Sequence, residues 1–167
     1  LGSWVIAPTV ADGIEHFSGQ ASCDFSWGFG VIGAIDFLTQ LAAATEDQTL
    51  RTAIANRCTA AMKWPFDQCQ FEDGAIGMSG RDDKWLGMTA GAIQSFMRTR
   101  DAGFLSEEEV AGYRPKAVAA RDWLLQNATA DGIAAGGYFP ITGKSEPRPP
   151  DNLAWMLGLT LQALADL

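Results

Sequence analysis

Aspartate residues placed shortly before tryptophan residues are the side chains of this chain best suited to acid–base chemistry. The aspartates are Asp24, Asp82, Asp83 and Asp151, and the tryptophans that follow them within four residues are Trp27, Trp85 and Trp155. A protonated carboxyl group can donate a proton to a glycosidic oxygen while a second carboxylate acts as base or nucleophile. Tryptophan rings offer flat apolar faces on which sugar rings stack. The pattern therefore predicts catalytic aspartates beside substrate-binding tryptophans in a site for a carbohydrate.

The same aspartates have a structural interpretation. An aspartate just before a helix is a preferred N-cap, which stabilises the helix by about 1 kcal/mol, and capping is the favoured interpretation for Asp24 and Asp151. Asp82 and Asp83 differ from them because one cap needs only one acid. Arg81 and Lys84 flank this pair, so a solvated cluster of charges is the competing interpretation there.

Three further residues are candidates for substrate binding. They are His16, which is the only histidine, Arg81 and Tyr138. Tyr138 belongs to a long loop, 132–155, and loops of this length often carry function, which makes it a candidate lid.

No metal site and no cofactor is predicted. The single histidine and the absence of a Cys-x-x-Cys pair leave no set of ligands with the spacing of a zinc site. Cys58 and Cys69 are predicted to be buried free thiols, with a disulfide between them as the alternative. The redox state of Cys23 stays open.

These residues belong to a repeat with a period of about 60 residues. Trp4, Trp64 and Trp123 mark it, and each is followed within nine residues by an Asp-Gly pair. The pairs are Asp12-Gly13, Asp73-Gly74 and Asp131-Gly132, and we expect each to form a turn, because glycine adopts the positive φ that such turns require. Repetition at this period indicates stacked supersecondary units. The predicted units are 12–72, 73–130 and 131–167.

Each unit is predicted to be a helical hairpin. The stretches 31–38, 89–96 and 157–164 align with one another and are nearly all apolar, which is typical of buried, inner helices. Outer helices are predicted to begin at two capping boxes, 45–48 and 106–109. Pro115 must kink the second outer helix or mark a fresh start. The buried faces of the outer helices are predicted to hold Leu50, Ile54, Cys58 and Met62, and Ala117, Ala120, Arg121 and Leu124.

The predicted fold is therefore all-α, with inner and outer helices alternating in a partial toroid of about three hairpin repeats, and with almost no strand. In such an array the loops 14–27, 74–85 and 132–155 would share one rim and the links 44–48 and 100–106 the other. Because apolar faces remain at the ends of the array, we expect them to meet the remaining repeats of a longer parent chain or a second copy. A half-ring whose ends pack on each other is the alternative.

Composition narrows the classes of partner. The net charge is −8, and the basic residues form no stripe, which argues against binding to nucleic acid or to an anionic membrane. No apolar run reaches the length of a membrane span. Neither feature indicates a compartment, so localisation stays open.

The repeat resembles that of the α/α-toroid superfamily, which includes terpenoid cyclases, protein prenyltransferases and several (α/α) glycoside hydrolases and polysaccharide lyases. Residues 123–132, WLLQNATADG, followed by a glycine-rich loop and an inner helix, look most like the prenyltransferase and squalene-oxidase type of repeat. The resemblance covers the whole chain and implies the fold rather than the chemistry.

The chemistries of that superfamily can be compared with this chain. Class II terpenoid cyclases use an Asp-x-Asp-Asp motif, and the nearest match, 80–83, lacks its first aspartate and has Arg81 there. The zinc-dependent members need ligands that are missing here. The favoured interpretation is therefore a segment of an enzyme that acts on an oligosaccharide or sugar polymer as a hydrolase or lyase. The alternatives are a non-catalytic toroid that binds a ligand or a protein, and a terpenoid cyclase-like enzyme with an incomplete acidic motif.

Overall fold

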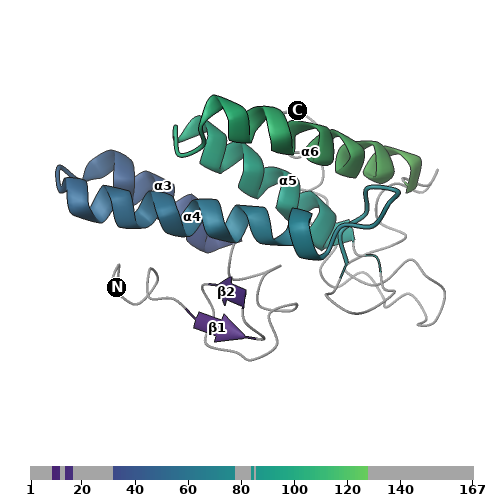
Figure 1. Cartoon of the computed structure of the whole chain (residues 1–167), viewed down its shortest axis with the longest axis horizontal. Coiled ribbons are helices and arrows are strands. Elements are labelled where there is room, and N and C mark those ends of the chain that lie inside the picture. Colours follow the sequence, from purple (N-terminus) through teal and green to yellow (C-terminus); the bar gives the residue numbers. More distant parts are fainter. Residues whose placement is uncertain (1–8, 12–13, 17–31, 78–83, 85, 128–167) are drawn as a thin grey trace.

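The computed structural model describes residues 9–11, 14–16, 32–77, 84 and 86–127. In this part the chain forms four helices and one short hairpin of strands (Figure 1). The helices are α3 (Ile32–Ala44), α4 (Gln48–Gln68), α5 (Leu86–Asp101) and α6 (Glu107–Asn127). The strands are β1 (Thr9–Ala11) and β2 (Ile14–His16). The predicted all-α class is confirmed for the helical body of this part.

The hairpin at β1 and β2 departs from the prediction that strands are almost absent. The two strands pair antiparallel, and Ala11 lies opposite Ile14 across residues 12 and 13. Those two residues are an Asp-Gly pair, and Asp-Gly is a preferred sequence for the tightest hairpin turns. The sequence pattern predicted a turn at this pair but not the strand pairing of the residues on either side of it.

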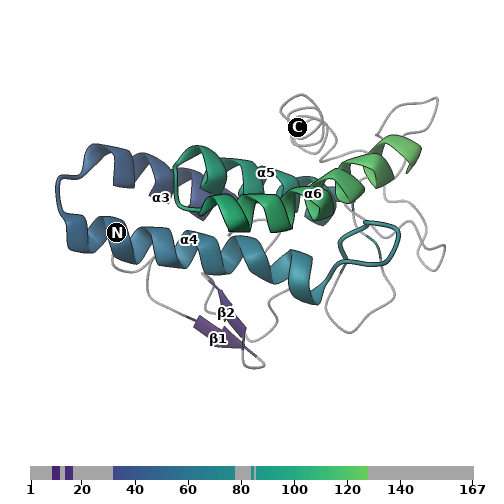
Figure 2. The ribbon, with the colours of Figure 1, turned by 45° about the horizontal axis from the view of Figure 1, so that its top comes forward.

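The four helices form two hairpins that pack side by side. Helix α3 packs against α4 and α5 against α6, and the two hairpins meet where α5 contacts both α3 and α4 and where α4 contacts α6. Figures 1 and 2 show the α3–α4 link and the α5–α6 link at the same end of the bundle, on the left. Residues 69–77, which follow α4, lie at the other end. The described part thus contains two neighbouring helical hairpins.

Helix α5 is the inner element of this body. Every residue from Gly87 to Met97 is buried, and Phe96 is the largest fully buried side chain. Helix α3 aligns with α5 in the sequence but is buried on one face only, through Ile35, Leu38 and Ala42. The physical reason is the number of neighbours, because α5 packs against three described helices and α3 against two.

The outer helices bury one stripe each, as predicted. In α4 the buried residues include Ile54, Cys58 and Met62, and Leu50 is partly buried against them. In α6 they include Ala117, Ala120 and Leu124, whereas Arg121 is only half-buried and forms an ion pair with Asp122. Arg121 therefore stands at the border of the stripe rather than within it.

One of the two predicted capping boxes is confirmed. The Ser106 Oγ accepts a hydrogen bond from the Glu109 N–H (3.2 Å), and the Ser106 N–H donates to Glu109 Oε2 (2.8 Å). The other box is wrong. Asp47 caps α4 by accepting from the N–H groups of Thr49 (2.9 Å) and Leu50 (3.1 Å). Its carboxylate stands closer to the first turn than the Thr45 hydroxyl, which accepts instead from the Asp47 N–H.

Pro115 lies inside α6, which runs continuously from Glu107 to Asn127. The alternative of a fresh helix start at this residue is therefore wrong. Proline removes one N–H from the ladder, so the carbonyl of Ala111 loses its partner. Both Ala111 and Pro115 are exposed, and water can satisfy that carbonyl.

Candidate functional site

Most residues of the predicted site lie outside the described part of the chain. These are Asp24, Asp82, Asp83, Asp151, Trp27, Trp85, Trp155, Arg81 and Tyr138. His16 is described and ends β2, where it pairs with Thr9. What the structure describes of the predicted rim is therefore strand β2, the second Asp-Gly turn, and Lys84, which stands directly after the Asp82-Asp83 pair.

The turn at Asp73 and Gly74 is confirmed. Gly74 has a φ of +93°, a conformation that residues with a Cβ rarely adopt. The Phe71 N–H donates to the Ala75 carbonyl (2.8 Å) and the Gly74 N–H to the Phe71 carbonyl (2.9 Å). The Asp73 carboxylate accepts from the Ala75 N–H (3.3 Å). These bonds close a tight loop between the end of α4 and the start of α5.

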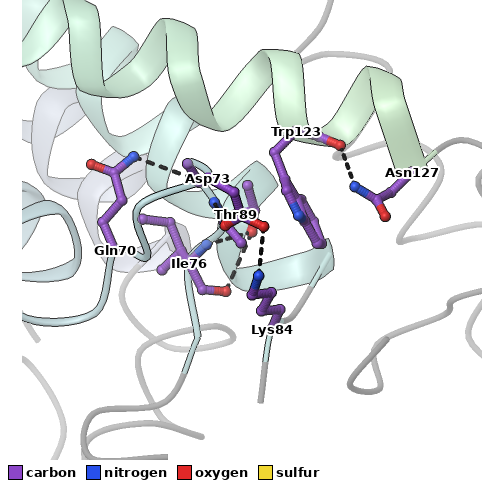
Figure 3. A network of polar contacts seen from close by, with 9 residues as sticks. Gln70, Asp73, Ile76, Lys84, Thr89, Trp123 and Asn127 are labelled. Atoms are coloured by element: carbon purple, nitrogen blue, oxygen red, sulfur yellow. Dashed lines mark hydrogen bonds and ion pairs between the residues drawn. The ribbon is translucent and has the colours of Figure 1, made fainter. Parts of the chain in front are cut away.

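The turn is fixed against the outer helix α6 (Figure 3). The Gln70 Nε2 donates to the Gly74 carbonyl within the turn (3.2 Å). It also donates to the Lys116 carbonyl of α6 (2.9 Å). A Cβ added to Gly74 would stand 2.3 Å from the carbonyl oxygen of Ala119. Glycine is therefore required here twice, for its φ and for the close approach of the turn to the α6 backbone.

The turn is also fixed to the inner helix α5. The Ile76 N–H donates to the Thr89 Oγ1 (2.9 Å), and the same hydroxyl donates to the Ile76 carbonyl (3.3 Å). Both residues are fully buried. Ile76 lies opposite Gln70 in an antiparallel bridge, with its own N–H and carbonyl pointing away from Gln70. Thr89 provides the hydrogen-bond partner for both of these buried backbone groups.

An ion pair between Lys84 and Asp73 links the start of the turn to the residues just before α5 (Figure 3). Burial raises the pKa of Asp73. Hydrogen bonds from Lys84 and from the Ala75 N–H, together with the charge of Lys84, lower this pKa by more, so it lies below its ordinary value. Lys84 also forms an antiparallel bridge with Gly77 and stands 5.2 Å from the centre of the Phe71 ring. Asp73 is therefore held ionised, which suits a structural anchor and not a general acid.

The β1–β2 hairpin lies against the outer helix of its own repeat, as the second Asp-Gly turn does. Strand β2 contacts α4, as the turn of the second repeat contacts α6. Each Asp-Gly segment thus precedes an inner helix and lies on the outer helix of the same hairpin. This arrangement was not predicted, because the partners are separated by a whole inner helix in the sequence.

An open groove of about 450 Å³ lies between the outer helices, beside the α5–α6 link. Its lining consists of Asn56, Thr59, Ala60, Lys63, Phe104 and Glu109. Lys63 and Glu109 form an ion pair across it, and the Thr59 hydroxyl donates to the Phe104 carbonyl. The groove lies at the rim for which the sequence predicted no site, and the charged groups of Lys63 and Glu109 in it are paired with each other.

Next to this groove, Tyr113 of α6 is held between two lysines of the outer helices. Its hydroxyl donates to Asp67 Oδ2 (2.6 Å), and the Nζ atoms of Lys116 and Lys63 stand 5.0 and 6.0 Å from its ring centre. Burial and the negative charge of Asp67 raise the pKa of Tyr113. The cluster joins α4 to α6, and no local pattern in the sequence signals it, because Asp67 and Tyr113 are 46 residues apart.

Replacing Glu109 with Gln should make stability less dependent on acid pH. Hydrogen bonds from Lys63 and from the Ser106 N–H hold the pKa of Glu109 at about 2, below its ordinary 4.5. The stabilisation from this depressed pKa is complete above pH 4.5 and is lost as the pH falls toward 2. In urea titrations the variant should be less stable than the parent at pH 7 by at most about 1 kcal/mol, since the pair is partly exposed. The difference should shrink below pH 4.5, and a difference that is constant down to pH 2.5 would contradict this account.

Other residues that the sequence singled out are packing residues. Trp64 and Trp123 are buried at matching places near the ends of α4 and α6. Cys58 and Cys69 are buried and free, as predicted, and burial raises the pKa of the Cys58 thiol to about 12. In the part of the chain that is described, no cluster of three or more His, Cys, Asp or Glu side chains could hold a metal ion. No described helix combines the length and apolar character that a membrane span requires.

Comparison of the chain with protein-family models, with curated proteins and with solved structures found no match. The assignment of function therefore depends on the geometry of the described helices and turns and on the repeat in the sequence.

Proposed function

We propose that the chain is a segment of an α/α-toroid enzyme that acts on a carbohydrate, with its site at the rim where the Asp-Gly turns precede the inner helices. The observation that carries the proposal is the bridge between Gly77 and Lys84. Residues 78–83 connect these two bridged residues, so the segment that holds Asp82 and Asp83 begins and ends at this rim.

The alternation of the helices supports the toroid. Two hairpins pack with α5 as a buried inner element and with α4 and α6 in contact on the outside. Repetition of this step would bring each Asp-Gly turn to the same rim. Carboxylates from neighbouring turns could then approach one substrate, as acid–base cleavage of a glycosidic bond requires.

Two described carboxylates, Asp73 and Glu109, are poorly suited to be the general acid of the proposed mechanism. Asp73 and Glu109 have pKa values below their ordinary range because lysine side chains hold them ionised. A general acid needs the opposite shift. In the proposed mechanism one carboxyl of the Asp82-Asp83 pair donates a proton to the leaving oxygen, while a carboxylate from a neighbouring turn takes a proton from the water that attacks the anomeric carbon. Trp85 stacks on a sugar ring.

The test is replacement of Asp82 and Asp83 together by asparagine. Activity would be followed by release of reducing ends from a panel of soluble xylan, mannan, β-glucan and pectin, and binding by retardation in gels that contain the same polymers. We expect the double variant to lose at least about 100-fold in rate, the usual order for loss of a general acid. Its unfolding temperature should stay within about 3 °C of the parent, because asparagine can still cap a helix.

The matched control is the double replacement of Glu107 and Glu108 by glutamine, because these neighbouring acids are exposed in the first turn of α6 at the opposite rim. It should keep full activity. Retardation of the parent without turnover on any polymer would favour the non-catalytic binding toroid. Full activity in the Asp82 and Asp83 variant would exclude these acids from catalysis.

A further inference from the structure

The Asp73-Gly74 pair is open to a spontaneous covalent change, because glycine has no side chain to hinder attack by its amide nitrogen. In this reaction a bond forms between the Gly74 nitrogen and Asp73 Cγ. The OH of the protonated Asp73 carboxyl group and the hydrogen of the Gly74 amide leave as water, and a succinimide ring results. Water then opens the ring. Opening at the main-chain carbonyl gives isoaspartate, in which the backbone runs through the former side chain.

The turn restrains the attacking nitrogen. The Gly74 N–H donates to the Phe71 carbonyl (2.9 Å), and the Gly74 carbonyl accepts from Gln70 Nε2 (3.2 Å). Ring closure has to rotate the peptide group between Asp73 and Gly74, which breaks these bonds. The rotation is also opposed by the α6 backbone, because Gly74 lies so close to it that an added Cβ would stand 2.3 Å from the Ala119 carbonyl oxygen.

The carboxyl group that would be attacked is restrained as well (Figure 3). Asp73 Oδ1 accepts from the Ala75 N–H (3.3 Å), and Oδ2 accepts from Lys84 Nζ. Burial raises the pKa of Asp73, yet the bonds from Lys84 and the Ala75 N–H hold it below its ordinary value. An ionised carboxylate has no OH to release as water, so it is the less reactive form. The Asp73 side chain is still 44% exposed, and water can therefore reach it.

Lys84 is the restraint on this carboxylate that comes from outside the turn itself. Its backbone is bridged to Gly77, and its Nζ stands 5.2 Å from the centre of the Phe71 ring. We propose that Asp73 is a latent site of isoaspartate formation, which the folded turn and its ion pair with Lys84 protect. Isoaspartate would add one methylene group to the backbone where the turn meets α6, so the protection preserves the rim.

Peptide mapping of the full chain after incubation at pH 7 tests the proposal. Chromatography and fragmentation separate the isoaspartyl peptide from its parent, and loss of one water marks the succinimide. Conversion at Asp73 should be at least about tenfold slower in the folded chain than in urea, because it then proceeds only from molecules whose turn is locally open. In urea Asp73 should convert at a rate similar to those of the other Asp-Gly pairs, at Asp12 and Asp131.

Replacement of Lys84 isolates the ion pair. Lys84→Met removes the charge but keeps an apolar chain, and it should speed conversion at Asp73 in the folded chain about three- to fivefold, the range for a partly exposed pair. Lys84→Arg keeps the charge and should retain the parent's rate. The matched control is Lys63→Met, which removes the partly exposed pair with Glu109 at the opposite rim and should not speed the reaction.

In urea Lys84→Met should convert at the parent's rate, because the two residues are 11 positions apart. Should Lys84→Met fail to fold, the parent in about 1 M salt replaces it, since salt screens a partly exposed pair and should speed conversion in the folded chain but not in urea. Equal rates for the parent in buffer and in urea would overturn the proposal, as would a Lys84→Met chain no faster than Lys63→Met. Isoaspartate is measured without substrate, so the test is independent of the proposed function.

Discussion

Replacing Gly74 with alanine should destabilise the protein by about 3 kcal/mol and lower its unfolding temperature by about 6–12 °C. Two costs add at this residue. Its φ of +93° is unfavourable for any residue with a Cβ. The new Cβ would also stand 2.3 Å from the Ala119 carbonyl oxygen and 3.0 Å from the Ala120 nitrogen. Both atoms belong to the backbone of α6, which cannot yield as a flexible side chain would. Thermal unfolding followed by circular dichroism would measure the change.

Two other glycines separate the two costs. Gly103 has a φ of +72° but nothing lies within 4 Å of an added Cβ, so Gly103→Ala should cost about 1–2 kcal/mol from backbone strain alone. Gly112 is exposed within α6 and has open space around it, so Gly112→Ala should stabilise by about 0.5–1 kcal/mol through helix propensity. The expected order of stability is Gly112→Ala, parent, Gly103→Ala, Gly74→Ala. If Gly74→Ala is no worse than Gly103→Ala, the close approach to α6 is not a constraint.

This contrast shows which parts of the fold could be predicted from the sequence. The turn at Gly74 was predictable, because Asp-Gly is a local signal. The helices and their buried stripes were predictable from the spacing of Ile54, Cys58 and Met62. The contact between Gly74 and Ala119 was not, since it joins residues 45 positions apart in the chain. Local rules also failed at the start of α4, because Thr45 and Asp47 both offer a side-chain oxygen and the sequence pattern favoured Thr45, whereas Asp47 is the cap.

The candidate site could be predicted less well than the fold. The repeat indicates that equivalent acids and tryptophans precede each inner helix, but spacing alone does not say which of them cap helices and which face a ligand. Described residues of the rim show the difficulty. Asp73 was read only as part of a turn, yet it also pairs with Lys84, the residue after the Asp82-Asp83 pair. The pKa of a side chain depends on the charged groups beside it. Tertiary packing decides which groups these are, so the sequence alone does not give the pKa.

Replacing Thr89 with valine should destabilise the protein by about 2–3 kcal/mol, although the shape of the side chain barely changes. The hydroxyl accepts from the Ile76 N–H and donates to the Ile76 carbonyl, and both residues are fully buried. Valine would leave these two backbone groups without a partner, and each buried unpaired group costs about 1–3 kcal/mol. Urea unfolding at pH 7 would measure the loss. Thr89→Ser keeps the hydroxyl and should recover most of the stability, with a remaining deficit of about 1 kcal/mol from the missing methyl group.

Ser95 provides the matched control on the same helix. It is also buried, but its Oγ has no hydrogen-bond partner in the structure. Removing a hydroxyl that is already unpaired removes a desolvation cost, so Ser95→Ala should change stability by no more than about 0.5 kcal/mol or raise it slightly. If Thr89→Val and Ser95→Ala lose equal amounts of stability, the loss at Thr89 comes from the packing of α5 and not from the two hydrogen bonds. A large loss at Thr89 with none at Ser95 would show that α5 anchors the Asp-Gly turn through this one hydroxyl. The rim would then depend on the inner helix for the position of the segment that carries Asp82 and Asp83.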